Sequence, residues 1–138
     1  PMNEDWAFDM FQSLNATGTP LTAIETFKPT VVNVTDNQGA DKYKDSEAEM
    51  SFEKIDKLFA NSNKASQKNK LASEFLTSFA ITSSGLKLES HFSKQRKWLD
   101  ETYMNKNGIG CKDYPDQCAF INFFGNYAQF YKEVWIDY

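Results

Sequence analysis

The spacing of apolar residues is the feature that most constrains the fold of this chain. Apolar residues recur at intervals of three and four, as in Ile55, Leu58 and Phe59, and this interval places them on one face of a helix. The alternation of apolar and polar residues that marks a strand is weak throughout, and the run 31–34 is the only plausible short strand. The sequence therefore predicts a mainly all-α fold, a helical bundle of about five to six helices.

The predicted helices are joined by short polar segments and suit one domain. A chain of 138 residues is long enough to bury a sizeable core. We expect a single helical domain over residues 1–138, with a motif-bearing helical pair at 4–33, a mobile loop at 34–46 and a helical bundle at 47–138. The predicted helices span about residues 4–14, 22–28, 47–60, 66–82, 90–104 and 115–136.

Local signals indicate where several of these helices begin or end. Thr22 and Glu25 have the spacing of a capping box at the start of the second helix. Pro29 lies inside the apolar pattern of that helix, so the helix either ends beside it or kinks there. Ser46 or Ser51 is expected to cap the next helix, because a serine hydroxyl accepts a hydrogen bond from the first turn.

Composition and charge narrow the classes of function. The formal charge of −4 and the pI near 5.0 argue against a general nucleic-acid binder, although a local basic patch remains open. No apolar run approaches the length of a membrane span, and we expect a cytoplasmic protein that does not contact a membrane. Cys111 and Cys118 are expected to be reduced thiols, with a bridge between them as the alternative. Their spacing fits no common zinc site.

The run 11–28 carries the only specific signature in the sequence. An apolar stripe over residues 6–14 leads into Asn15, Thr17 and Gly18, which favour a tight turn, and a helix follows from Thr22. One interpretation is a capped turn that joins two core helices. The other is a nest of backbone and side-chain groups that faces an anion or a neighbouring domain, since helix N-termini bind anions.

This run resembles the signature of a known family. The sequence F-Q-S-L-N-A-T-G-T-P-L-T-A-I-E-T-F-K is similar to the pattern F-x-x-L-N-x-x-G-x-x-L-x-x-x-D-L-x-K of the GmrSD-type restriction endonuclease N-terminal domain family. The resemblance is specific over residues 6–33, and looser similarity continues over residues 86–99. The positions that match are Phe11, Leu14, Asn15, Gly18, Leu21 and Lys28, with Glu25 where an Asp is usual.

Members of that family have a ParB/sulfiredoxin-like core with a DGQQR motif, followed by a helical region. They include modification-dependent and phage-defence DNA nucleases that use nucleotides, often with a separate HNH nuclease domain. The resemblance implies that this chain belongs to a nucleotide-dependent DNA restriction or phage-defence protein. It also implies a nucleotide-binding role for residues that lie on or beside the signature: Asn15, Thr17, Gly18, Glu25 and Lys28.

The chain also departs from the family pattern. DGQQR does not occur in it, and its single histidine, His91, cannot supply an HNH constellation. We therefore expect the helical, non-catalytic part of a larger α/β plus α protein, whose DGQQR-containing domain lies upstream and is its partner. No cofactor is expected in this chain. The resemblance implies that the full-length protein uses a nucleoside triphosphate and a divalent metal and contacts DNA.

A second candidate site is a group of basic residues close together in the sequence. Lys87, Lys94, Arg96 and Lys97 are candidates for contact with phosphate or DNA, because cations dominate such binding. The alternative is an ordinary solvated helix face, since acidic residues lie nearby. His91 precedes the same helix and is either a general base or a capping or packing residue.

The last predicted helix carries aromatic side chains on more than one face. Such a helix is either buried on several sides or covers a domain or subunit outside this chain. The alternative function is therefore a non-enzymatic protein-interaction module, and association into a homo-oligomer is one form of it. The residues expected on the partner surface are Phe130, Tyr131 and Trp135.

Overall fold

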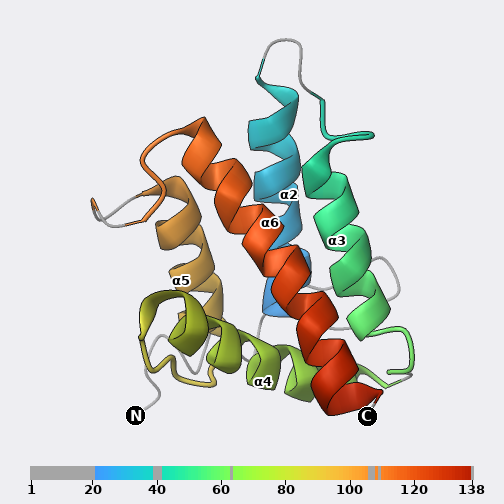
Figure 1. Ribbon diagram of the computed structural model, residues 1–138. Helices are drawn as coiled ribbons and strands as arrows, with labels where there is room; N and C mark the ends of the chain where they lie inside the picture. Colours follow the sequence, from blue (N-terminus) through green and yellow to red (C-terminus); the bar gives the residue numbers. More distant parts are fainter. Residues whose placement is uncertain (1–20, 39–41, 63, 106–107, 109, 138) are drawn as a thin grey trace. The chain divides into compact units, whose positions relative to one another are not determined.

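The regular elements are helices, which confirms the predicted all-α bundle (Figure 1). The computed structural model describes residues 21–38, 42–62, 64–105, 108 and 110–137, and the predicted helix at 4–14 lies outside this part of the chain. The observed elements are α2 (Ala23–Asp36), α3 (Glu47–Leu58), α4 (Ala65–Ser84), α5 (Phe92–Met104), α6 (Tyr114–Tyr131) and the π-helix η1 (Lys132–Ile136).

The chain divides into two compact units. Unit 1 contains the described residues up to Phe27 together with Ser62–Leu99, and therefore holds α4, the start of α2 and most of α5. Unit 2 contains Lys28–Asn61 and the described residues from Asp100 onward, and holds α3, α6 and η1. The single domain expected over residues 1–138 stays a prediction.

The core of unit 1 is built on one face of α4. Phe75, Leu76 and Phe79 recur at the helical interval and are fully buried. The ring of Trp98 on α5 meets the ring of Phe79 edge to face, with centroids 5.9 Å apart. Gly85 ends α4 with a φ of 73°, a left-handed conformation that glycine adopts without steric cost.

Helix α2 extends further than its sequence indicates. It continues through Pro29 to Asp36, so the first of the two alternatives at Pro29, a helix end, is wrong. The run 31–34, the only plausible strand in the sequence, is helical, and the loop expected from residue 34 starts after Asp36. Pro29 removes one backbone hydrogen bond, which disfavours a helix interior by about 3 kcal/mol. Burial of Val31 and Thr35, one helical turn apart beyond the proline, offsets this cost.

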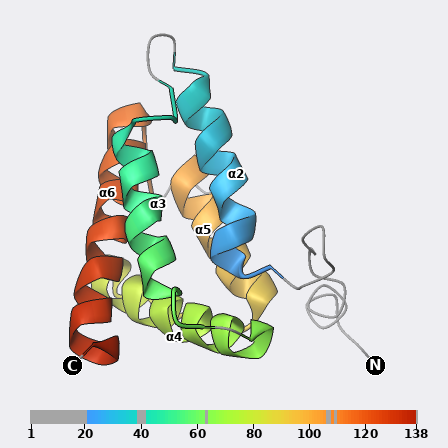
Figure 2. The same ribbon diagram turned by 90° about the vertical axis from the view of Figure 1, so that its right-hand side faces the viewer.

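Unit 2 is organised around the packing of α3 along α6, which lie side by side in both views (Figures 1 and 2). Ser46 caps α3, since its Oγ accepts a hydrogen bond from the N–H of Glu49 at 3.2 Å, and this confirms one of the two predicted caps. The two helices are in close contact at Ser51 and Gly125. A Cβ on Gly125 would lie 2.6 Å from the Cβ of Ser51, so only glycine fits at that position.

The described residues just before α6 contact the end of α5 within unit 2. Gly110 has a φ of 118°, and a Cβ there would lie 2.4 Å from the carbonyl oxygen of Thr102. The same oxygen accepts a hydrogen bond from the N–H of Cys111 at 3.0 Å. Asp113 then caps α6 by accepting a hydrogen bond from the N–H of Asp116 at 3.0 Å. A side chain larger than that of glycine therefore does not fit at residue 110.

Candidate functional site

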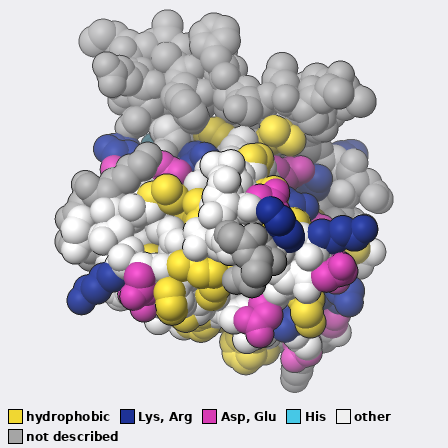
Figure 3. All heavy atoms as spheres, turned by 90° about the horizontal axis from the view of Figure 1, so that it is seen from above, with side chains coloured by type: hydrophobic (Ala, Val, Ile, Leu, Met, Phe, Trp, Pro, Cys, Tyr) yellow, Lys and Arg dark blue, Asp and Glu magenta, His cyan; other side chains and the backbone are white. Residues whose placement is uncertain are grey.

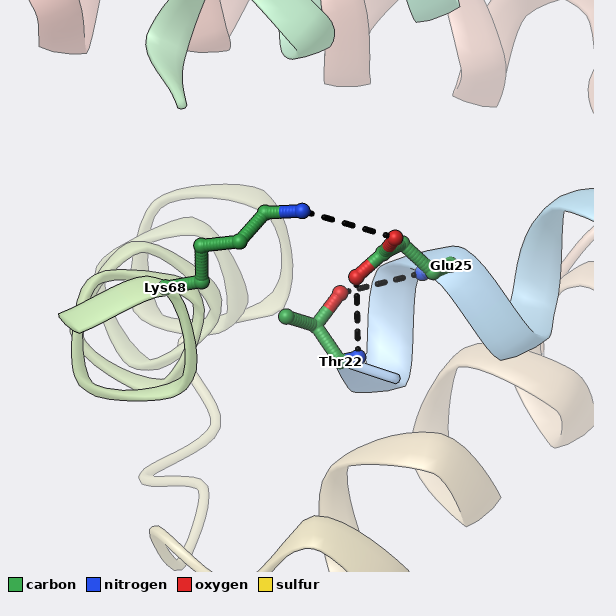
Figure 4. Close-up of polar contacts among 3 residues, drawn as sticks. All are labelled: Thr22, Glu25 and Lys68. Carbon is green, nitrogen blue, oxygen red and sulfur yellow. Dashed lines mark hydrogen bonds and ion pairs between the residues drawn. The ribbon is translucent and has the colours of Figure 1, made fainter. Parts of the chain in front are cut away.

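The described end of the signature run is a capping box (Figure 4). The backbone N–H of Thr22 donates to Oε1 of Glu25 at 3.1 Å, and the N–H of Glu25 donates to Oγ1 of Thr22 at 3.1 Å. The second carboxylate oxygen of Glu25 lies 3.6 Å from Nζ of Lys68 on α4. Both oxygens of Glu25 are thus engaged in holding the start of α2.

The other residues of the implied nucleotide site are only partly described. Asn15, Thr17 and Gly18 lie outside the described residues. Lys28 is half-buried, and its Nζ lies 5.8 Å from the ring centroid of Phe52, a cation–π arrangement within unit 2. The side chains of Glu25 and Lys28 thus contact the backbone of Thr22 and the side chains of Lys68 and Phe52.

The four basic residues of the second candidate site all lie in unit 1. Lys87 is exposed in the loop before α5, and Lys94, Arg96 and Lys97 lie on α5 itself. Arg96 is half-buried, and its guanidinium carbon lies 6.0 Å from the ring centroid of Phe27. The exposed cations are Lys87 and Lys97, and contact of this group with phosphate stays a prediction.

The two cysteines are unbridged thiols with different surroundings. Cys111 is buried, and burial raises its pKa to about 11, with further contributions from Asp116 and Asp113. Its Sγ also contacts the carbonyl oxygen of Asp116 at 3.6 Å. Cys118 is half-buried on α6. Among the residues that the structure describes, no three His, Cys, Asp or Glu side chains gather as metal ligands would.

A cavity of about 600 Å³ lies within unit 2, and the sequence reading missed it. We call it the unit 2 cavity. Tyr114, Gln117, Cys118, Ile121 and Asn122 line one side of it and follow the helical interval along one face of α6. The sequence signal for this cavity was the spacing of amide, thiol and aromatic side chains along one face of α6. The remaining lining residues are Val31, Thr35, Lys42, Lys44, Asp45, Ser46, Glu47, Ala48 and Tyr103.

Hydrogen bonds hold several lining groups of the unit 2 cavity in place. Nε2 of Gln117 donates to the carbonyl oxygen of Tyr103 at 2.9 Å, and Nδ2 of Asn122 donates to Oε2 of Glu47 at 3.0 Å. Burial, followed by the neighbouring Cys118, raises the pKa of Tyr103 above its usual range, so its phenol is neutral at physiological pH. The fold therefore holds the amides of Gln117 and Asn122 and the neutral phenol of Tyr103 in place along the cavity.

The three residues of the predicted partner surface differ in burial. Phe130 and Trp135 are 53% and 68% exposed, whereas Tyr131 is 8% exposed and its ring belongs mainly to the interior of unit 2. Trp135 lies on η1, and its ring centroid is 6.2 Å from that of Tyr131. The neighbouring exposed apolar residues of the same segment are Phe123, Val134 and Ile136.

No known family model matches this chain, and no curated protein is significantly similar to it. None of the described helices is long and apolar enough to cross a membrane.

Proposed function

We propose that this chain is the helical, non-catalytic part of a larger nucleotide-dependent DNA restriction or phage-defence protein similar to the GmrSD-type family. The observation that carries the proposal is the run 11–28, which follows the signature of that family. The capping box of Thr22 and Glu25 supports it, because a fixed helix start follows the run of Asn15, Thr17 and Gly18. A helix N-terminus carries partial positive charge and suits a phosphate.

Within this proposal the signature residues have different tasks. Glu25 is a positioning residue, because its carboxylate oxygens hold the N–H of Thr22 and the ammonium of Lys68. Asn15 and Thr17 hydrogen-bond the phosphate or sugar of the nucleotide, and Lys28 neutralises phosphate charge as a compact cation. The reacting groups belong to the upstream DGQQR-containing domain.

The test uses the full-length protein, including the segment encoded immediately upstream. Asn15→Ala is expected to lower kcat/KM for nucleoside triphosphate hydrolysis by about tenfold, since a hydrogen bond to a charged group is worth about 1.5 kcal/mol or more. Glu25→Gln is the matched control, because glutamine also completes a capping box, and hydrolysis should stay near the wild-type rate. Melting temperatures measured alongside show whether each variant is folded.

Two results would contradict this proposal. One is an upstream coding sequence that contains no DGQQR segment in frame. The other is unchanged hydrolysis in Asn15→Ala. If Glu25→Gln lost activity while its melting temperature stayed unchanged, Glu25 would contact the nucleotide and its assignment as a positioning residue would be wrong.

A second function is favoured by the exposed aromatic side chains of Phe130 and Trp135. Aromatic side chains are enriched in protein–protein interfaces relative to the rest of the protein surface. We propose that this segment binds a protein partner, a second copy of the chain included. This binding is compatible with a role as a non-catalytic part of a larger protein.

Trp135→Asp is expected to abolish this association, because the charge would be buried against an apolar partner. Sedimentation of the purified chain measures self-association, and co-purification with the full-length protein measures partner binding. Gln129→Asp is the matched control, since it adds the same charge at an exposed position of α6 without removing a ring. A wild-type chain that is monomeric and retains no partner would contradict this function.

A further inference from the structure

The unit 2 cavity has an inner wall and a mouth that differ in chemistry. Val31, Thr35, Tyr103 and Ile121 line it and are at most 2% exposed, so they form the inner wall. The charged lining residues are exposed and therefore lie at the open side. These residues of the mouth are Lys42, Lys44, Asp45 and Glu47.

Among the described residues that line the mouth, the charges balance in sign. Two ammonium groups face the same opening as two carboxylates, so a ligand of either net charge is attracted by one pair and repelled by the other. Figure 3, which views the molecule from the end where the α2–α3 loop lies, shows Lys, Arg, Asp and Glu side chains interspersed on that face. A ligand that carries one positive and one negative charge can interact favourably with the carboxylates and with the ammonium groups at the same time.

The charged groups at the mouth retain hydrogen-bond donors and acceptors for such a ligand. Nζ of Lys42 donates to the carbonyl oxygen of Asp36 at 3.2 Å, which leaves two of its three N–H donors. Oε2 of Glu47 accepts from Nδ2 of Asn122 at 3.0 Å, which leaves its second oxygen to accept. The N–H of Tyr43 donates to Oδ1 of Asp36 at 2.9 Å and holds the backbone beside Lys42. The cations and carboxylates of the mouth therefore lie on a segment that hydrogen bonds hold in place.

The inner wall suits an apolar or aromatic group. Side chains of Val31 and Ile121 give it aliphatic surface, and the ring of Tyr103 adds an aromatic one. A volume of about 600 Å³ lies within the range of small-molecule sites. We propose that the unit 2 cavity binds a small zwitterion, a free amino acid with an apolar or aromatic side chain. The ammonium and carboxylate of the ligand meet the mouth, and its side chain enters the interior.

The test compares three probes that share a benzene ring and differ in charge: phenylalanine, 3-phenylpropanoate and 2-phenylethylamine. Each is titrated into the whole ¹⁵N-labelled chain, and the amide shifts give the site and the dissociation constant. We expect phenylalanine to shift amides of α6 residues 117–122 and to bind about tenfold more tightly than either analogue, because each analogue loses one charge-assisted contact. This experiment does not involve the nucleotide site, so its result is independent of the proposed function.

Substitutions at the mouth complete the test. Lys44→Gln should weaken the binding of phenylalanine and of 3-phenylpropanoate, whose carboxylates lose a cation, but not that of 2-phenylethylamine. Glu47→Gln should weaken the binding of phenylalanine and of 2-phenylethylamine, whose ammonium groups lose a carboxylate, but not that of 3-phenylpropanoate. Lys57→Gln is the control, since Lys57 is exposed on α3 outside the cavity lining. Equal affinity for the three probes, shifts outside the cavity, or no binding at millimolar concentration would overturn the proposal.

Discussion

Gly125→Val is expected to lower the free energy of unfolding by about 3 kcal/mol, the upper part of the usual cost of overpacking a core. The cause is the contact of α3 with α6. A Cβ at residue 125 would lie 2.6 Å from the Cβ and 2.7 Å from the Cα of Ser51. The Cα cannot rotate away as a flexible side chain can, so the helices themselves must separate.

Gly125→Ala tests the same contact through the direction in which the stability changes. Helix propensity alone favours alanine over glycine by about 1 kcal/mol, so an uncrowded site would gain stability. The crowded site should lose stability instead. Urea unfolding followed by circular dichroism measures the change, with Ala119→Val at an exposed position of α6 as the control for bulk. A stabilised Gly125→Ala variant would contradict the close packing of Ser51 against Gly125.

Phe79→Ala is expected to cost about 4 kcal/mol of unfolding free energy, typical of deleting a large buried aromatic side chain. The ring of Phe79 is fully buried in unit 1. It stacks on Phe75 with centroids 6.2 Å apart and meets Trp98 edge to face. Its removal loses the transfer free energy of the ring and leaves a cavity that its two aromatic partners fill only in part.

The same urea unfolding experiment compares Phe79→Ala with the truncation of a nearby residue on α4. Ile81→Ala is the control, because Ile81 is 51% exposed and its truncation should change stability by less than about 0.5 kcal/mol. Phe79→Leu should fall between the two, since leucine retains much of the apolar volume. Equal losses for Phe79→Ala and Ile81→Ala would show that Phe79 is not a core residue of unit 1.

Much of the helical architecture was predictable because local chemistry encodes it. The capping box of Thr22 and Glu25 and the serine cap at Ser46 need only residues three positions apart, and both are present in the structure. The interval of Ile55 and Leu58 likewise indicated the buried face of α3. These signals depend on the geometry of a single helix, so they can be read without knowledge of its neighbours.

The candidate sites were less predictable. The task of Glu25 was implied by a resemblance, yet its second carboxylate oxygen faces Lys68, a residue 43 positions later that no local rule connects to it. Tyr131 was expected on a partner surface and is nearly buried, whereas Phe130 beside it is exposed. Aromatic character alone does not tell which side of a helix the rest of the chain covers.

The sequence by itself determined that this chain forms helices and where most of them start, because periodicity and caps act within one turn. Only the tertiary structure decided that α2 passes through Pro29, since the buried Val31 and Thr35 have partners elsewhere in the chain. The same holds for the glycine at 125, whose necessity comes from Ser51 on another helix. It holds also for the unit 2 cavity, whose walls come from segments far apart in the sequence and exist only once those segments pack.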